Sequence, residues 1–288
     1  MGYHIIPIYH LYIIKVLFLI LTRKIDGIIV NSINILWKNR LLLKLNLTIP
    51  IYWWYFDTAM VTQKRVKKVN KIAPQINIFF NKDRGEFHRY HKMGAKPIWL
   101  DQGAESVCNF VETEKQEFDL GFIGGMSHIH KERTSILREL DKKYNLAIYT
   151  PHEMRYKKNG FKNVYPPILH AEFGKVASKI RIMLNLSVNN TQPFYWSNRI
   201  HLLLGSGAFC ISEYVEGIEE SYTNEKDCLF FHNLNELYKL IDYWIQENMD
   251  GAREKIRHQG HLTAQKKHSY KNRIIKFLKH LDTKNYNC

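Results

Sequence analysis

Short runs of β-branched and aromatic residues alternate with amphipathic helical stretches along most of this chain. Strand-like runs such as Phe118–Ile123 and Leu146–Tyr149 are each followed by a polar turn and then by a helical stretch. This alternation is typical of βα units, whose strands form a parallel sheet covered by helices. The pattern therefore predicts an α/β protein.

The expected elements follow from these periodicities. Strands are expected over Asp26–Val30, Ile49–Trp54, Ile76–Phe80, Lys96–Leu100, Phe118–Ile123, Leu146–Tyr149, Ile180–Leu186, Ala208–Ser212 and Cys228–Phe231. Helices are expected over Ile33–Leu45, Thr58–Ile72, Asp83–Met93, Lys131–Lys143, Pro193–Leu204, Leu234–Glu247 and most of Ala252–Leu281. Residues Pro151–Pro167 are expected to be irregular.

A polar stretch, Asp101–Glu117, interrupts the alternation before it restarts. A chain of 288 residues suffices for two small domains. We therefore expect an N-terminal Rossmann-like domain over residues 1–116 and a C-terminal one over residues 117–288. Ligands of open parallel sheets bind outside the carboxyl ends of the strands, so two such domains would face a cleft lined by strand-to-helix loops.

The chain is strongly basic, with 42 Lys and Arg against 27 Asp and Glu and a formal net charge of +15. Such a field favours anionic partners, which include nucleotide phosphates, nucleic acids and anionic membrane faces. The basic residues are spread along the chain and form no run of five or more like charges, so a nucleic-acid-binding arm is not indicated. The four cysteines show no metal-ligand or disulfide spacing, and reduced thiols are usual in a cytoplasmic protein.

The apolar stretch Ile5–Leu21 is interrupted by Pro7, His10 and Lys15. It is short for a spanning helix, which needs about 20 apolar residues, and it lacks the basic start and cleavage site of a signal peptide. A buried or interfacial helix is favoured over a membrane anchor. We therefore expect a cytoplasmic protein with, at most, peripheral contact with the inner face of the membrane.

A glycine pair, Gly124–Gly125, follows the strand that begins the second half. Glycines let the backbone approach a phosphate closely, and the N-terminus of the following helix offers unpaired N–H groups. His128, His130 and Arg133 add basic side chains nearby. This arrangement is a candidate phosphate site, although the pair alone fits an ordinary tight turn at least as well.

A second candidate is Asn198-Arg199, in the helix before Gly205-Ser206-Gly207. Arginine is suited to bidentate phosphate contacts, and Gly207 would permit close approach of the backbone to a ligand. Alternatively, Arg199 lies on the surface and the glycines only end the helix.

A third candidate is the acidic pair Glu219-Glu220 in the loop after the strand Ala208–Ser212. A carboxylate there could accept hydrogen bonds from ribose or sugar hydroxyls. The preference of helix N-termini for acidic residues explains either glutamate equally well.

A fourth candidate is Trp53-Trp54-Tyr55-Phe56-Asp57, at the end of a strand in the first domain. Aromatic rings can stack on a sugar, and Asp57 could bind hydroxyls or accept a proton. Alternatively, these aromatic residues belong to a core strand and Asp57 caps the next helix. The chain contains no His-Glu-x-x-His or Asp-x-Asp motif, so we expect no dedicated catalytic metal.

These pieces, in this order, resemble the CgeB-like branch of the family 1-type glycosyltransferases. In the second half the matching stretches are Asp119–Gly125 with Arg133, Lys179–Asn185, Asn198–Arg199 through Gly207–Phe209, Gly217–Tyr222, Asp227–Phe231 with Asn235–Leu237, and Gly260 with His268–Arg273. The first half is similar more loosely, over Ile49–Asp57 and Phe80–Leu100.

The resemblance implies a GT-B enzyme of polysaccharide biosynthesis. It would transfer a hexose from a UDP- or GDP-linked nucleotide-sugar to a glycan, lipid-linked or protein acceptor, and no other cofactor or metal would be required. The C-terminal domain would hold the donor through Gly124, Gly125, Arg133, Asn198, Gly207 and Glu219 or Glu220. Arg199 would bind the diphosphate in catalysis, and Asp57 would contact the acceptor or act as base.

Two departures from that family keep other functions open. Related glycosyltransferases often carry a Glu-x7-Glu pair before the glycine turn, whereas Phe194 and Leu202 stand at those positions here. The N-terminal domain is also short, because its usual first strand and glycine loop are not found. A catalytically degenerate sugar-binding or scaffold protein is therefore the second hypothesis, and a basic nucleic-acid-binding protein is the third.

Overall fold

The structure is a computed structural model. It describes residues 18–19, 22, 25, 27–38, 43–44, 49–125, 131–187 and 191–282. The chain divides into two compact units, Met1–Leu100 and Asp101–Cys288. The expected helix over Ile5–Leu21 lies almost wholly outside the described residues. Within the described ranges, no helix is both long enough and apolar enough to cross a bilayer.

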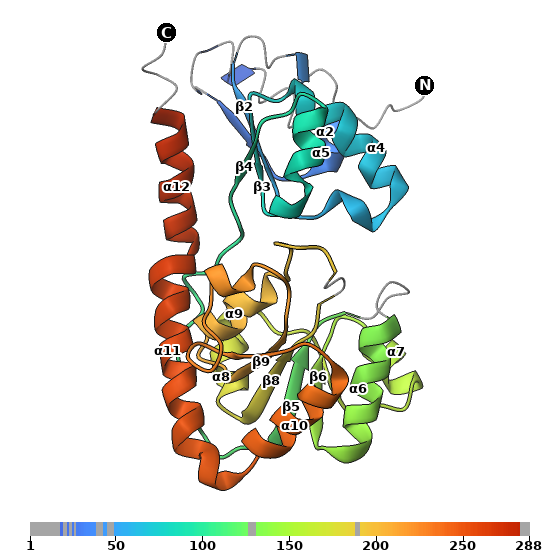
Figure 1. Cartoon of the computed structure of the whole chain (residues 1–288), viewed down its shortest axis with the longest axis vertical. Helices are drawn as coiled ribbons and strands as arrows, with labels where there is room; N and C mark the ends of the chain where they lie inside the picture. Colours follow the sequence, from blue (N-terminus) through green and yellow to red (C-terminus); the bar gives the residue numbers. More distant parts are fainter. Residues whose placement is uncertain are drawn as a thin grey trace, which may run out of the picture. The chain divides into compact units, whose positions relative to one another are not determined.

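The first unit contains a parallel sheet with the strand order β1-β2-β3-β4. Its strands are β1 (Ile28–Val30), β2 (Ile51–Tyr55), β3 (Ile78–Asn81) and β4 (Pro97–Trp99), and its helices are α2 (Ile33–Lys38), α4 (Gln63–Ile72) and α5 (Phe87–Lys92). The three helices pack on one face of the sheet (Figure 1), where their apolar side chains share one core with Trp53 and Phe79. The Trp53 and Phe79 rings stack with centroids 4.8 Å apart.

The second unit contains a six-stranded parallel sheet with the order β10-β9-β8-β5-β6-β7. Its strands are β5 (Phe118–Ile123), β6 (Leu146–Tyr149), β7 (Asn163–Tyr165), β8 (Ile180–Asn185), β9 (Cys210–Glu213) and β10 (Leu229–Phe231). The chain runs outward from β5 to β7, returns to the other side of β5 with β8, and then runs outward to β10. This is the Rossmann strand order, and its switch point lies between β5 and β8.

Helices cover both faces of this second sheet. They are α6 (Lys131–Lys143), α7 (Glu153–Lys158), α8 (Phe173–Ala177), α9 (Arg199–Gly205), α10 (Leu234–Trp244), α11 (Asp250–His268) and α12 (Tyr270–Asp282). Helices α6 and α7 lie on one side of the sheet, and α8, α9 and α11 lie on the other (Figure 1). The core on the α6 side includes side chains from α6, α7 and α10 and from the strands. The expected α/β class is therefore confirmed in both halves.

Two differences from the expected elements stand out, besides the unexpected α8 and the later starts of α4 and α5. Residues Pro151–Pro167 contain α7 and the edge strand β7, a strand too short to stand out in the sequence. The helix expected over Pro193–Leu204 begins only at Arg199. The reason is local, because Phe194 has a positive φ of 57°, which is incompatible with a right-handed helix.

The junction between the units lies at Leu100–Asp101, before the boundary expected after residue 116. Residues that follow Leu100 belong to the second unit because their backbone is bonded to its helices. The Ala104 amide donates to the carbonyl of His268 over 2.8 Å, and Tyr270 donates to that of Ala104 over 2.9 Å. The Arg257 guanidinium donates to the carbonyl of Val111 over 2.7 Å.

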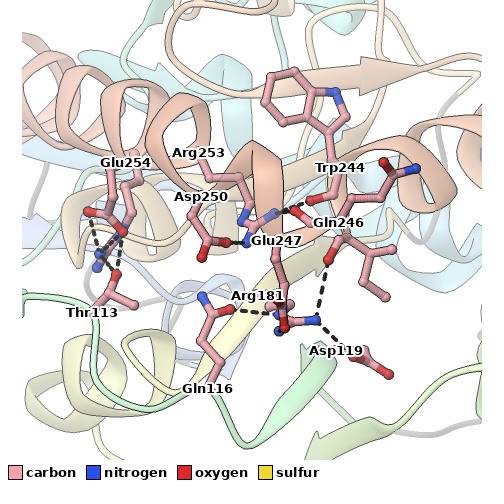
Figure 2. Close-up of polar contacts among 12 residues, drawn as sticks. Thr113, Gln116, Asp119, Arg181, Trp244, Gln246, Glu247, Asp250, Arg253 and Glu254 are labelled. Atoms are coloured by element: carbon pink, nitrogen blue, oxygen red, sulfur yellow. Dashed lines mark hydrogen bonds and ion pairs between the residues drawn. The ribbon is translucent and has the colours of Figure 1, made fainter.

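Figure 2 shows the polar contacts of two arginines of the second unit, the half-buried Arg181 and the buried Arg253. Arg181 donates to Gln116 over 2.8 Å and lies 3.9 Å from the Asp119 carboxylate. Arg253 donates to the carbonyls of Trp244 and Gln246, the last residue of α10 and one shortly after it (Figure 2). Carbonyls at the end of a helix have no intrahelical partners, so the Arg253 guanidinium supplies the missing hydrogen-bond donors.

A second buried polar cluster surrounds Asp101, at the start of the second unit. The Asp101 carboxylate accepts hydrogen bonds from Trp196 over 2.8 Å and from His201 over 2.9 Å. The ring of His268 stacks on that of His201 with centroids 5.4 Å apart. The cluster joins the segment after the junction to α9 and α11, so it fixes where the second unit begins.

We expect His268 to make the second unit sensitive to acid. The ring accepts a hydrogen bond at Nδ1 from Arg273 and donates from Nε2 to the carbonyl of Ser221, both over 2.9 Å, which defines a neutral tautomer. Burial, together with the charges of His201 and Arg273, lowers the pKa of His268 to about 3. Unfolded histidine titrates near pH ~6.5. The unfolded state therefore binds the extra proton below that pH, and stability is lost as the pH falls.

Urea unfolding at pH values between about 7.5 and 5 would measure this effect. The free energy of unfolding should fall by up to about 1.4 kcal/mol per pH unit below ~6.5 through this one group. In His268→Gln, which retains an amide able to donate and accept, that part of the slope should vanish. Equal slopes in the two proteins would show that His268 does not contribute.

Candidate functional site

The candidate site lies at the switch point of the second sheet, where β5 and β8 end side by side. Gly124 and Gly125 directly follow β5, and Asn185 is the last residue of β8. The amide of Gly124 donates to the carbonyl of Tyr149, at the end of β6, over 3.0 Å. Crevices at this point of a doubly wound sheet are where such folds bind their ligands.

A side chain at Gly124 would not fit beside its neighbours. A Cβ atom there would lie 2.7 Å from the ring of Phe122 and 2.9 Å from Nη2 of Arg199. The absence of a side chain thus lets the Arg199 guanidinium approach the backbone that follows β5. The sequence predicted both Gly124 and Arg199 as donor-binding residues, and the structure brings them together.

Two guanidinium groups lie against the same aromatic ring, that of Phe122. The guanidinium carbon of Arg133, in the first turn of α6, is 5.1 Å from the ring centroid, and that of Arg199, the first residue of α9, is 5.0 Å from it. Arg133 donates to the carbonyl of Gly125. Arg199 donates to Asn185 Oδ1 over 3.4 Å and to the carbonyl of Leu186 over 3.3 Å. These contacts hold two cations at the carboxyl ends of the strands.

Burial works against the positive charge of both guanidinium groups. Burial and the positive charge of Arg133 lower the pKa of Arg199 to about 9. Burial also lowers the pKa of Arg133, and the carboxylate of Glu213 opposes that shift only in part. A lowered pKa of this kind means that the charged form is less stable than in water. An anionic ligand would therefore stabilise this pair.

Tyr156, on α7, adds a third hydrogen-bond donor near the two arginines. Its side chain is fully buried, and its hydroxyl finds no hydrogen-bond partner among the described residues. Burial raises its pKa, and the charges of Arg133 and Arg199 act in the opposite direction. The hydroxyl therefore stays protonated at neutral pH and can donate. A buried, unpaired hydroxyl costs about 1–3 kcal/mol, so a ligand that accepts its hydrogen bond would recover that energy.

Other polar groups at this edge escaped the sequence-based prediction. Glu213 ends β9, and its carboxylate accepts a hydrogen bond from the amide of Ser187 over 2.8 Å. The side chain of Asn185 donates to Ser212 Oγ over 2.9 Å. Their place at the ends of β8 and β9 was the available signal, because those strands were expected from the sequence.

The sequence also predicted that Asn198, Glu219 and Glu220 bind the nucleotide-sugar donor. Asn198 directly precedes α9, and its buried Oδ1 has no hydrogen-bond partner in the described part of the chain. Glu219 and Glu220 are exposed in a short 3-10 turn after β9, and the Glu219 carboxylate accepts the amide of Gly217 over 3.1 Å. Both glutamates follow the carboxyl end of a strand, as expected.

Gly207 is not brought to the candidate site. It lies after α9 and before β9, at the opposite edge of the sheet, where the strands begin. Its φ is +73°, and a Cβ atom would lie 2.4 Å from the ring of Phe110. Its carbonyl accepts a hydrogen bond from Arg257 over 2.6 Å. These contacts give Gly207 a structural role, in place of the expected close approach to a donor.

In the first unit, the structure favours the core interpretation of the aromatic stretch before Asp57. Trp53, Trp54 and Tyr55 are at most 5% exposed, so their rings are not available to a sugar. Asp57 itself is exposed and lies 3.4 Å from Arg65. It does not cap the next elements, because Thr58 and Thr62 do. Its carboxylate remains accessible at the end of β2.

No group of three or more His, Cys, Asp or Glu side chains is arranged to hold a metal ion in the described part of the chain. The donors that the structure describes there are two guanidinium groups and a phenol. This set of donors is suited to phosphate oxygens.

Comparisons with known proteins identify the family and the fold. Residues 133–279, about half of the chain, match the family model described as glycosyl transferase-like. This match spans Arg133, Tyr156 and Arg199. No curated protein matches the chain.

Several solved structures share the fold at low sequence identity. Sucrose-phosphate synthase of Thermosynechococcus elongatus is 10% identical, with a TM-score of 0.68 over 92% of this chain and 75% of that one. Alr3699/HepE of Anabaena, in complex with UDP-glucose, is 11% identical, with a TM-score of 0.69 over 90% and 79%. A glycosyltransferase of Rickettsia africae is 13% identical, with a TM-score of 0.64 over 100% and 85%.

The likeness confirms the expected GT-B fold, in which two α/β units each contain a parallel sheet. The Rossmann strand order of the second unit and its arginine pair fall within the matched family region or directly beside it. The chain belongs to the glycosyl transferase-like family.

Proposed function

We propose that this glycosyltransferase transfers a sugar from a UDP- or GDP-linked donor to a glycan, lipid-linked or protein acceptor, without a metal ion. The observation that supports this function is the pair Arg133 and Arg199, held against Phe122 beside Gly124–Gly125. The departing nucleoside diphosphate gains negative charge as the glycosidic bond breaks. Fixed guanidiniums in a partly buried site can stabilise that charge in place of a metal ion.

The other roles in the proposal follow from position in the fold. The second unit would hold the donor, and Asn198 and Glu219 or Glu220 would contact its ribose or sugar hydroxyls. The first unit would hold the acceptor, where the exposed Asp57 would bind a hydroxyl or act as base. We assign the chain to the CgeB-like branch, to the cytoplasm and to peripheral contact with the inner face of the membrane.

Calorimetric titration of the full chain with UDP, GDP and their glucose and N-acetylglucosamine conjugates tests the donor site. We expect saturable binding of one nucleotide and of its sugar conjugate, with no change when EDTA is added. The nucleotide that binds would then be used to detect its release from the sugar conjugate. A folded sample that binds none of them would contradict the proposal and favour a degenerate sugar-binding or scaffold protein.

Tyr156→Phe should have opposite effects on stability and on binding. Removing a buried hydroxyl that has no partner among the described residues should leave the free energy of unfolding unchanged or raise it by about 1 kcal/mol. Affinity for the nucleoside diphosphate should fall by about 10- to 150-fold, which corresponds to one lost hydrogen bond to a charged group.

Tyr243→Phe is a matched control for this substitution, because Tyr243 is 55% exposed on α10. It should change neither quantity. Unchanged nucleotide affinity in Tyr156→Phe would remove Tyr156 from the proposed site, whatever its effect on stability.

A further inference from the structure

A cavity lies on the second sheet, on the side that α8 covers. Its volume is about 280 Å³. It is formed where α8 and the residues on either side of it pass the strands β5, β6 and β7. The residues that line it and carry the inference below are Phe118, Tyr149, Tyr165, Glu172, Lys175 and Lys179.

Three half-buried aromatic rings form one wall of this cavity. Tyr149 and Tyr165 are paired residues at the ends of β6 and β7, and their rings stack with centroids 5.1 Å apart at 24°. The ring of Phe118 meets that of Tyr165 at 72°, with centroids 5.8 Å apart. The ring of Phe118 and the two tyrosine rings therefore meet at a steep angle. They offer flat apolar surfaces together with two phenol groups. Surfaces of this kind suit a ligand with both apolar faces and hydroxyl groups.

The charges around the rings are balanced. Lys179 pairs with Glu117 over 2.8 Å, and burial together with the Tyr165 and Glu117 charges raises the pKa of Tyr149 to about 12, so its phenol stays protonated. Glu172 accepts the amide of Leu169 over 2.7 Å, while Lys175 is exposed. With two carboxylates and two ammonium groups, the lining offers donors and acceptors without a net charge. An uncharged polyol therefore fits better than an anion, in contrast to the arginine pair.

Tyr149 belongs both to the cavity and to the strand end beside the glycine pair. The backbone carbonyl of Tyr149 accepts the amide of Gly124, and its side chain lines the cavity. A ligand on the aromatic wall would thus lie one strand away from the glycine pair. This closeness favours a ligand that takes part in the same reaction.

We propose that this cavity is a carbohydrate subsite, which holds sugar residues distant from the reacting end of an oligosaccharide acceptor or product through the rings of Phe118, Tyr149 and Tyr165. The proposal rests on the proposed function, because it makes the acceptor a glycan. The volume suits one or two sugar rings. Stacking by Tyr165 supplies affinity, and the phenols, Glu172 and Lys175 bond the hydroxyls.

Calorimetric titration with maltotetraose, cellotetraose and chitotetraose at millimolar concentration tests the subsite, with UDP and GDP titrated into the same samples. We expect one of these probes to bind wild type and to bind Tyr165→Ala at least about tenfold more weakly, as for an aromatic residue that dominates an interface. Tyr165→Phe retains the ring and should retain most of the affinity. Lys175→Ala, at an exposed position, should weaken binding about threefold without any effect on folding.

The outcomes separate this inference from the proposed function. If a nucleotide binds but none of the three oligosaccharides does, or if Tyr165→Ala and Lys175→Ala bind them as wild type does, the subsite is wrong and the donor site stands. If an oligosaccharide binds in the expected way but no nucleotide does, the subsite stands and the transferase proposal fails.

Discussion

Arg199→Ala should lower the affinity for the nucleoside diphosphate by about 10- to 100-fold, which corresponds to one lost hydrogen bond between charged groups. The rate of sugar transfer, measured as kcat/KM, should fall further, by about 10²- to 10³-fold. The reason is that the guanidinium acts on charge that develops only as the sugar leaves. Titration calorimetry and release of the nucleotide from its sugar conjugate would measure the two quantities.

The same substitution should leave the fold intact. Arg133 and Arg199 repel each other, and burial disfavours both charges, so removal of one relieves an unfavourable interaction. We therefore expect an unchanged or slightly higher melting temperature. Arg199→Lys retains the charge but not the planar fork, and it should retain part of the affinity.

Arg138→Ala is the matched control for Arg199→Ala. Arg138 lies on α6 with Arg133, but its exposed side chain donates to Asn159 over 2.9 Å. It should bind nucleotide and turn over as wild type does. If Arg199→Ala and Arg138→Ala had the same small effect, the arginine pair would not be the diphosphate site.

The individual strands of this fold can be predicted from the sequence, because each depends on the pattern of residues that are adjacent in the chain. The run Phe118–Ile123 forms β5 with the expected bounds, and so does Leu146–Tyr149 for β6. Since ligands of such sheets bind after the strands, the position of Gly124 directly after β5 is enough to make it a candidate.

The non-local part could not be predicted in the same way. The strand order places β8 beside β5, and only then does Arg199 reach the ring of Phe122. Tyr156 lies in a stretch that has no clear periodicity, and its burial depends on the packing of α7. Gly207 was expected at the candidate site, but the structure places it where the strands begin. The reason is that a glycine turn has the same sequence pattern at either end of a strand.

The departure from the Glu-x7-Glu pattern also has a structural counterpart. Phe194, at the first of these positions, adopts a positive φ of 57°, and its amide bonds the carbonyl of Glu216 over 2.8 Å. A Cβ atom at Gly217 would lie 2.1 Å from its ring. Leu202, at the second position, is 6% exposed. Neither position can supply a carboxylate, so sugar hydroxyls must be bound by other groups, of which Glu219 and Glu220 are our candidates.

Gly260→Ala should destabilise the second unit by about 3 kcal/mol or more. Gly260 lies in α11 against the loop before β10, and a Cβ atom there would lie 2.2 Å from the carbonyl oxygen of Asp227. The same loop is held by a 2.7 Å hydrogen bond from Thr263 to the Asp227 carboxylate. A backbone atom cannot rotate aside as a side chain can, so the helix must move away from the sheet. Inserting atoms into such a contact costs about 1–3 kcal/mol or more.

Gly251→Ala tests whether this cost comes from the contact and not from the loss of a helical glycine. Gly251 lies in the first turn of the same helix, and a Cβ atom there would have no neighbour within 4 Å. This substitution should leave stability unchanged or raise it by up to about 1 kcal/mol, because alanine favours the helix. Urea unfolding followed by circular dichroism would compare the two variants with wild type. If both alanines had the same effect, close packing of α11 on Asp227 could not be the reason for a glycine at position 260; opposite effects would tie that glycine to the approach of two backbones.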